Sequence, residues 1–240
     1  MVDILKICNK VLERLNSMNY EHSGGNFAEQ LIFPLKNQTK GIVDRISEQE
    51  LRFLFVEEFK TTYPQLFYSV ETPTEKKYKF GEKYEDIIKN KNTHKVSAST
   101  DMCIFKRNEA DFKYERILNI EFKHENGALK NIAKDILKLI REKQDGVFIH
   151  LIKNSVRDTV CNDGKTGVFD KYLKAFLAFN DEWIDGNKSI QLVLISLKEK
   201  TLLYRKINKN DNLNNIFSFN GAYGNIKEVN KNEWKIEIIE

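Results

Sequence analysis

The stretch SASTDMCIFKRNEADFKYERILNIEFKHENGALK, residues 97–130, contains two short apolar runs with charged residues at their ends. Asp101 precedes the run MCIF, and Glu121 and Lys123 close the run ILNIEFK. Each run has the length and composition of a buried strand, and the polar turn near 108–112 predicts that the two strands form a hairpin. An unpaired charge is expensive to bury, so a metal ion or a phosphate is expected to compensate these carboxylates.

The segments on either side of this hairpin predict an α/β fold with a mixed sheet. A helix is expected from Ser47, which can form a capping box with Glu50, and a strand follows at 66–74. The charged segment 75–95 has no period and is expected to be a loop or a weak hairpin. After the hairpin, the pattern predicts helix 127–146, strand 147–154, helix 166–184 and strand 189–199. A hairpin followed by a crossover helix and a further strand gives a mixed sheet with helices on its faces.

A chain of 240 residues suits a single domain with one core. Residues 1–44 are expected to be an N-terminal helical extension, with an amphipathic helix at 2–18 and a short second helix at 27–37. Residues 45–200 are the expected core, and residues 201–240 are expected to add C-terminal strands and a loop.

The composition favours a cytoplasmic protein without membrane segments. Cys8, Cys103 and Cys161 are widely spaced, so no disulfide framework is expected and a reducing compartment fits best. The N-terminus has a helical pattern interrupted by charges, which is neither a signal peptide nor a membrane span. The four scattered histidines argue against a zinc site. The net charge of +4 permits a nucleic-acid partner but does not establish one.

The spacing of the charged residues indicates a shared site at one end of the hairpin. Side chains alternate between the faces of a strand, so Glu121 and Lys123 share a face and Phe122 points the other way. Asp101 begins the neighbouring strand and reaches the same end of the sheet. Two close carboxylates repel unless a cation lies between them, and oxygen ligands select magnesium or manganese. The alternative is a surface ion pair between Glu121 and Lys123, with Asp101 as an ordinary turn residue.

This arrangement, an Asp followed by Glu-x-Lys across a hairpin and then by a helix, resembles the PD-(D/E)xK nuclease superfamily. The resemblance covers about residues 45–155 and lies mainly in STD and NIEFKH, with Thr100 where the family often has proline. It implies a restriction-endonuclease-like fold and a Mg²⁺-dependent nuclease, with Mn²⁺ able to substitute. The implied substrate is DNA, cut by an endonuclease of restriction, defence or mobile-element type. A restriction enzyme ordinarily dimerises to cut both strands, so the resemblance also raises a homodimer.

The resemblance also implies roles for individual residues. Asp101 and Glu121 would bind the metal together with the backbone carbonyl of Phe122, and Lys123 would position the attacking water. The family often supplies another acid from the preceding helix, and Glu50 is the first candidate for it. Its place in the capping box is a competing interpretation of that residue, and Glu57, about two turns along the helix, is a competing acid.

Basic residues recur on the helix that follows Lys123. Lys130, Lys134, Lys138 and Arg141 are spaced by four, four and three residues, which predicts one stripe along the helix. Beside a metal site such a stripe would hold DNA phosphates, and Lys130 and Lys134 lie nearest to the site. The alternative is an ordinary solvated helix face.

A second functional hypothesis is a non-catalytic module on the same fold that binds nucleic acid or another protein. A degenerate member would be expected to lose the lysine or one of the acids. This chain keeps all three, which favours the nuclease.

Overall fold

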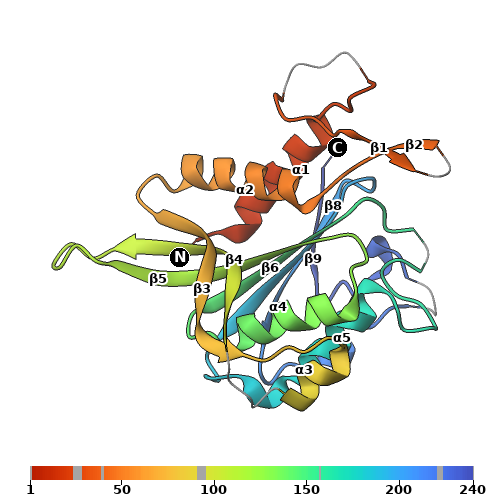
Figure 1. Ribbon diagram of the computed structural model, residues 1–240. Coiled ribbons are helices and arrows are strands. Elements are labelled where there is room, and N and C mark those ends of the chain that lie inside the picture. Colours follow the sequence, from red (N-terminus) through yellow and green to blue (C-terminus); the bar gives the residue numbers. More distant parts are fainter. Residues whose placement is uncertain are drawn as a thin grey trace.

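The computed structural model describes residues 2–23, 29–38, 41–90, 96–156, 158–220 and 224–239. Its main element is a mixed sheet of seven strands in the order β3-β4-β5-β6-β7-β8-β9 (Figure 1). These strands are β3 (Phe67–Tyr78), β4 (Val96–Arg107), β5 (Tyr114–His124), β6 (Asp145–Ile152), β7 (Ser189–Ser196), β8 (Thr201–Asn208) and β9 (Lys235–Ile238). β5, β6 and β7 run parallel, and the other neighbouring pairs are antiparallel. The predicted α/β class with a mixed sheet is therefore confirmed.

Helices cover both faces of the sheet (Figure 1). α1 (Ile4–Ser17) and α2 (Glu48–Thr62) pack on one face, and α3 (Tyr84–Asn90), α4 (Leu129–Arg141) and α5 (Val168–Ala178) pack on the other. The smaller elements are β1 (Leu35–Gln38), β2 (Gly41–Asp44), η1 (Asn180–Glu182), α6 (Leu213–Ile216) and η2 (Ile226–Glu228). Among the described residues, none of the helices combines the length and the apolar composition that a membrane crossing requires.

The alternation along β5 decides which side chains meet which helices. Ile120 and Phe122 are buried beneath α1 and α2, where the Phe122 ring meets Phe55 edge to face with 5.4 Å between ring centroids. Glu121 and Lys123 therefore face α4, on the opposite side of the sheet. The same alternation assigns apolar packing to one face of β5 and charge to the other.

The prediction of a second helix at 27–37 is wrong for residues 29–37, which the structure describes; residues 27–28 lie outside the described residues. Residues 35–38 pair with residues 41–44 as the hairpin β1–β2. Pro34 disfavours a helical conformation at Phe33. The Phe33 backbone instead forms hydrogen bonds with residues that follow α1. Its N–H donates to the Asn19 carbonyl (2.8 Å), and its carbonyl accepts from the Glu21 N–H (2.9 Å). Tertiary pairing thus replaces the local helix.

The segment expected to be a loop or weak hairpin at 75–95 contains the helix α3, although residues 91–95 lie outside the described residues. The Asp86 carboxylate accepts hydrogen bonds from the N–H groups of Glu82 (3.0 Å) and Lys83 (2.9 Å) and so fixes the entry into this helix. Gly81 precedes this turn with a φ of +71°, a conformation that glycine adopts without strain. A helix this short has too few turns to show a clear apolar period.

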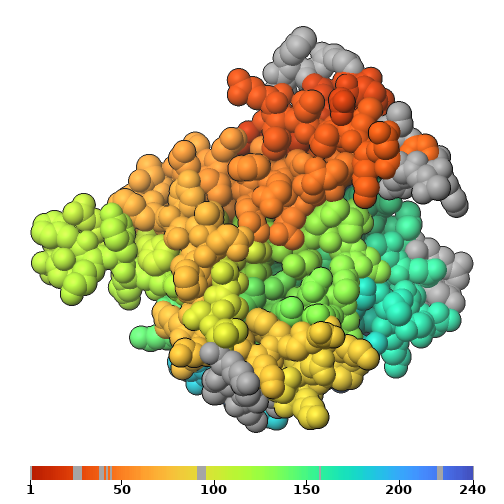
Figure 2. Space-filling view, viewed as in Figure 1, coloured from red at the N-terminus to blue at the C-terminus, as the bar shows by residue number. Residues whose placement is uncertain are grey.

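The ladder between β4 and β5 ends at the pair Met102 and Ile120, and this end positions the candidate site. Beyond it, residues 96–100 pair with β3 and residues 122–124 pair with β6. The Phe122 N–H donates to the Oδ2 atom of Asp101 (2.8 Å), so a side chain replaces the β4 backbone as acceptor. In the other direction β4 and β5 remain paired, and their turn projects from the body of the molecule (Figure 2).

His150 is a buried neutral side chain that ties β6 to its surroundings. Its Nε2 lies 2.5 Å from the Glu125 carbonyl and its Nδ1 lies 2.5 Å from the Tyr172 hydroxyl. Because a carbonyl only accepts, Nε2 carries the proton and Nδ1 accepts from Tyr172. Burial is the main reason that the pKa of His150 is lowered to about 3.

Acid should destabilise the fold through His150. Its pKa is about 3 in the folded chain and 6.5 ordinarily, so between these values the unfolded chain binds the proton more readily and stability falls as the pH falls. At pH 4 the loss is on the order of 3 kcal/mol. Urea unfolding should show the stability advantage of the parent over His150→Gln shrinking by this amount between pH 7 and pH 4. The exposed His22→Gln variant is the control, and a pH-independent advantage would contradict the prediction.

Candidate active site

The structure brings together three of the four predicted catalytic side chains. Asp101 lies on β4 and Glu121 on β5, one step beyond the last pair of their ladder, and Lys123 follows two residues later on the same face. The Glu121 side chain is 1% exposed, and those of Asp101 and Lys123 are 17% and 18% exposed. A fully buried carboxylate therefore lies beside two groups that solvent still reaches.

Asp101 is held from two sides. One carboxylate oxygen accepts from the Phe122 N–H, and the other lies 2.9 Å from the Arg52 guanidinium. Arg52 comes from α2 and also contacts Glu48 (3.0 Å) and Glu71 (3.1 Å). Because the N–H and C=O of one strand residue leave on the same edge, the Phe122 carbonyl faces the β4 side as well. Asp101 and the Phe122 carbonyl therefore lie along the same edge of β5.

Glu121 faces a lysine from α4. The Lys138 ammonium lies 2.7 Å from Glu121 Oε1 and 3.0 Å from Asp135, and it donates to the Ser99 carbonyl at 2.9 Å. The contact with Oε1 is an ion pair without the alignment of a hydrogen bond. Burial, followed by the charge of Asp135, raises the pKa of Glu121 well above its usual range.

Lys123 is oriented by two carboxylates. Its ammonium lies 2.7 Å from Asp135 on α4 and 4.0 Å from Glu48 on α2. Burial lowers the pKa of Lys123, but the nearby charges, Asp135 first, outweigh burial and the pKa is raised. Lys123 is therefore an ammonium at neutral pH, suited to stabilising negative charge and to orienting a water molecule.

The complete cluster joins both faces of the sheet. Its carboxylates are Glu48, Glu71, Asp101, Glu121 and Asp135, and its cations are Arg52, Lys123 and Lys138. Five carboxylates against three cations leave an excess of two negative charges when all are ionised, which equals the charge of one divalent cation. The oxygen donors of Asp101 and Glu121 fit Mg²⁺ chemically. In the described part of the chain, however, no three acidic, histidine or cysteine side chains converge closely enough to hold a metal as they stand.

The structure does not direct Glu50 toward this cluster. The Glu50 carboxylate accepts hydrogen bonds from the backbone N–H (2.6 Å) and the hydroxyl (2.5 Å) of Ser47, and so forms the capping box of α2. The competing acid Glu57 pairs with Arg14 of α1 at 2.7 Å. Glu48, two residues before Glu50 and on another side of the helix, is the α2 acid that reaches Lys123.

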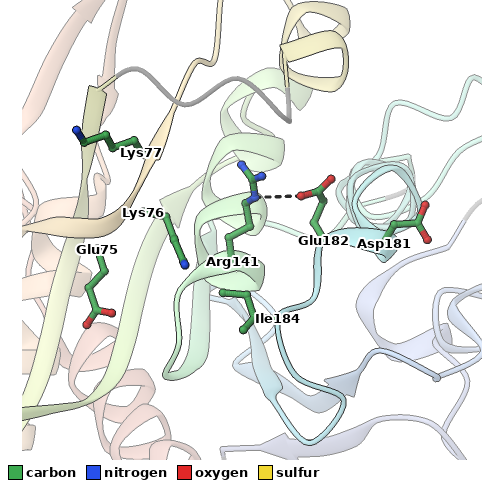
Figure 3. Close-up of a pocket in the computed structure, with 7 residues that line it drawn as sticks. All are labelled: Glu75, Lys76, Lys77, Arg141, Asp181, Glu182 and Ile184. Carbon is green, nitrogen blue, oxygen red and sulfur yellow. Dashed lines mark ion pairs between the residues drawn. The ribbon is translucent and has the colours of Figure 1, made fainter.

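The predicted basic stripe is divided in the structure. Lys138 is buried in the cluster, and Lys134 lies with its ammonium 5.2 Å from the centroid of the Phe80 ring. Arg141 points toward Glu182 at 3.0 Å and lines a hollow of about 540 Å³ at the far end of α4 (Figure 3). The other residues that line this hollow are Glu75, Lys76, Lys77, Asp181 and Ile184. The clustered carboxylates do not line this hollow.

Reasoning from the sequence does not place five members of the cluster at the site: Glu48, Arg52, Glu71, Asp135 and Lys138. Glu48 and Arg52 have a sequence signal, because an acid four residues before a base at a helix start predicts a shared face. Asp135 and Lys138 are three residues apart and flank the apolar face of α4, which is a weaker signal.

Comparison of the chain with protein-family models, with curated proteins and with solved structures gave no significant match. The candidate site therefore rests on the residues and their geometry.

The capping box predicts that Glu50 acts on stability. Glu50→Ala and Ser47→Ala should each lower the free energy of unfolding by about 1 kcal/mol, because each leaves helix N–H groups without an acceptor. The double variant should lose less than the sum, since both side chains belong to one interaction. Urea unfolding of the four chains measures this coupling. Strictly additive losses would show that the two side chains act independently.

Proposed function

We propose that this chain is a Mg²⁺-dependent nuclease that hydrolyses phosphodiester bonds in DNA. The observation that supports the proposal most is the placement of Asp101 and Glu121 on adjacent strands, each one step beyond the last pair of the β4–β5 ladder, with Lys123 two residues further on. Neighbouring carboxylates on a sheet are costly without a cation. An ammonium next to them is the group that phosphoryl chemistry needs for developing negative charge.

In this proposal Asp101, Glu121 and the Phe122 carbonyl hold the metal. When bound, Mg²⁺ supplies a Lewis acid for the phosphate and lowers the pKa of a coordinated water. Lys123 orients the attacking water and stabilises charge on the phosphate. Asp135 holds the Lys123 ammonium at 2.7 Å and limits the positions that it can take.

We assign the α2 carboxylate of the site to Glu48 in place of Glu50. Glu48 contacts both Lys123 (4.0 Å) and Arg52 (3.0 Å), so it connects the metal-binding strand to the helix. Arg52 also contacts Asp101, and its guanidinium lies 5.6 Å from the centroid of the Phe122 ring. These contacts fix α2 against the end of the β4–β5 ladder, where the substrate phosphate would enter.

The arrangement of the elements supports the resemblance to restriction-endonuclease-like nucleases. Helix α2 precedes three antiparallel strands, and α4 then crosses to the parallel strand β6. The endonuclease mode, the setting in restriction, defence or mobile elements, and a homodimer follow from this resemblance alone, since one fold supports many functions.

Cleavage should depend on the two strand carboxylates and on Lys123. Asp101→Asn and Glu121→Gln should lose Mg²⁺-dependent cleavage of supercoiled and linear DNA, because each removes an anionic metal ligand. Lys123→Met should lower turnover by about 10²–10³-fold, the usual cost of losing one group that stabilises transition-state charge. Glu115→Gln is the matched control, because Glu115 is an exposed carboxylate on β5, the strand that contains Glu121 and Lys123.

Gel assays with and without Mg²⁺, beside unfolding curves for every variant, separate lost chemistry from lost folding. Full cleavage by folded Asp101→Asn or Glu121→Gln would overturn the proposal. Metal-independent DNA binding without any cleavage by the parent would favour the alternative, a non-catalytic binding module.

Lys130 and Lys134 are proposed to contact DNA phosphates beside the site. Each change to alanine should weaken binding about equally for all sequences, because phosphate contacts carry no direct base information. Each should also reduce the slope of log affinity against log salt by roughly 0.9 for duplex DNA. Fluorescence anisotropy with Ca²⁺ in place of Mg²⁺ measures both effects. Lys235→Ala, on the distant edge strand β9, should keep the slope, and an unchanged slope in the double variant would refute the phosphate contacts.

A further inference from the structure

Lys138 is a buried cation that contacts two carboxylates and one backbone carbonyl. Its ammonium contacts Glu121 (2.7 Å) and Asp135 (3.0 Å) and donates to the Ser99 carbonyl (2.9 Å), while the residue is only 7% exposed. Ser99 lies two residues before Asp101 on β4. Lys138 therefore bridges from α4 to both strands that provide the proposed metal ligands.

The contact with Glu121 is close but poorly aligned. Glu121 Oε1 is buried and, in the described part of the chain, has no hydrogen-bond partner with suitable geometry. Lys138 is also the only ion-pair partner that the described residues offer to this carboxylate. A single poorly aligned cation compensates a buried carboxylate incompletely. Replacing it with a better-placed cation would therefore lower the free energy of the site.

We infer that Lys138 is a substitute cation, which neutralises Glu121 in the metal-free chain and leaves it when a divalent ion binds. The inference rests on the proposed function, because it takes Glu121 as a metal ligand. An ammonium and a divalent ion close to the same carboxylate repel each other, and that repulsion grows where water is excluded. The two cations therefore compete for Glu121. By occupying this carboxylate, Lys138 lowers the affinity of the site for metal.

Competition predicts that removing the lysine tightens metal binding. Lys138→Met keeps an unbranched side chain, shorter by one atom, and removes its charge. Isothermal titration with Mn²⁺ should give an affinity roughly 5- to 150-fold above that of the parent, the usual span of coupling between two ligands. The melting temperature without metal should fall, because Glu121 then lacks a partner, and the rise on adding Mn²⁺ should exceed that of the parent.

Lys134→Met is the matched control. It removes the same charge one turn earlier on α4, where the ammonium lies over the Phe80 ring and is not paired with Glu121. Its Mn²⁺ affinity should stay within about twofold of the parent's. An equal gain in both variants would assign the effect to net charge, and an unchanged or weaker affinity in Lys138→Met would show a supporting role for the lysine; either result overturns the inference.

A second measurement uses the parent chain and does not depend on the folding of a variant. Acetylation of lysines, read by mass spectrometry, should label Lys138 several-fold more in saturating Mn²⁺ than without metal, while Lys134 changes little. Continued protection of Lys138 in saturating Mn²⁺ would overturn the inference.

The two hypotheses fail in different ways. If the parent chain binds no Mn²⁺ and cleaves no DNA, both the proposed function and the inference are wrong. A parent chain that binds Mn²⁺ and cleaves DNA, together with a Lys138→Met variant of unaltered affinity, removes the inference alone.

Discussion

The buried carboxylate of Glu121 is the constraint on which the arrangement of the site depends. With 1% exposure it receives almost no hydration, so a neighbouring cation or a proton must stabilise it. The cation is Lys138, which reaches Glu121 because α4 is the crossover between the parallel strands β5 and β6. Asp135, three residues earlier on that helix, then contacts Lys138 and Lys123 together. One buried charge thus ties α4 to β5 on the side where the apolar face of the helix ends.

The charged cluster lies apart from the hollow at the far end of α4. The charged side chains of the cluster gather where β4 and β5 stop pairing. The hollow of about 540 Å³ lies instead between β3, the end of α4 and η1, where exposed side chains of both signs meet. The residues that line this hollow are thus different from those that form the candidate site.

The sequence was informative where periodicity and buried charge act together. The strand alternation was sufficient to predict that Glu121 and Lys123 share a face. Asp101 was expected to begin its strand but lies in the middle of β4, because residues 96–100 already pair with β3; it lies one step beyond the last pair of the β4–β5 ladder, as Glu121 does. The buried strands β6 and β7 were equally clear, because runs of apolar residues without alternation indicate a strand covered on both faces.

Other features depended on tertiary contacts, which cannot be read from local sequence patterns. Glu50 had two compatible roles, and the rotation of α2 decided between them by directing Glu48 toward Lys123. Lys138 fits a four-residue stripe as well as Lys134 does, but a small difference in helical angle places it beside Asp135 instead of in solvent. The hairpin β1–β2 replaced an expected helix because the backbone of Phe33 pairs with residues far from it in the chain.

The hydrogen bond from the Phe122 N–H to Asp101 has a consequence for spectroscopy. In most of a sheet, an amide proton exchanges with solvent only when two strands separate. At Phe122 the acceptor is a side chain, so rotation of the Asp101 carboxylate breaks this hydrogen bond without separating two strands. Its exchange rate, compared with that of Ile120 in the regular ladder, therefore reports the orientation of Asp101 separately from the opening of the sheet. Hydrogen–deuterium exchange at the Phe122 amide thus probes the site without an attached label or a substitution.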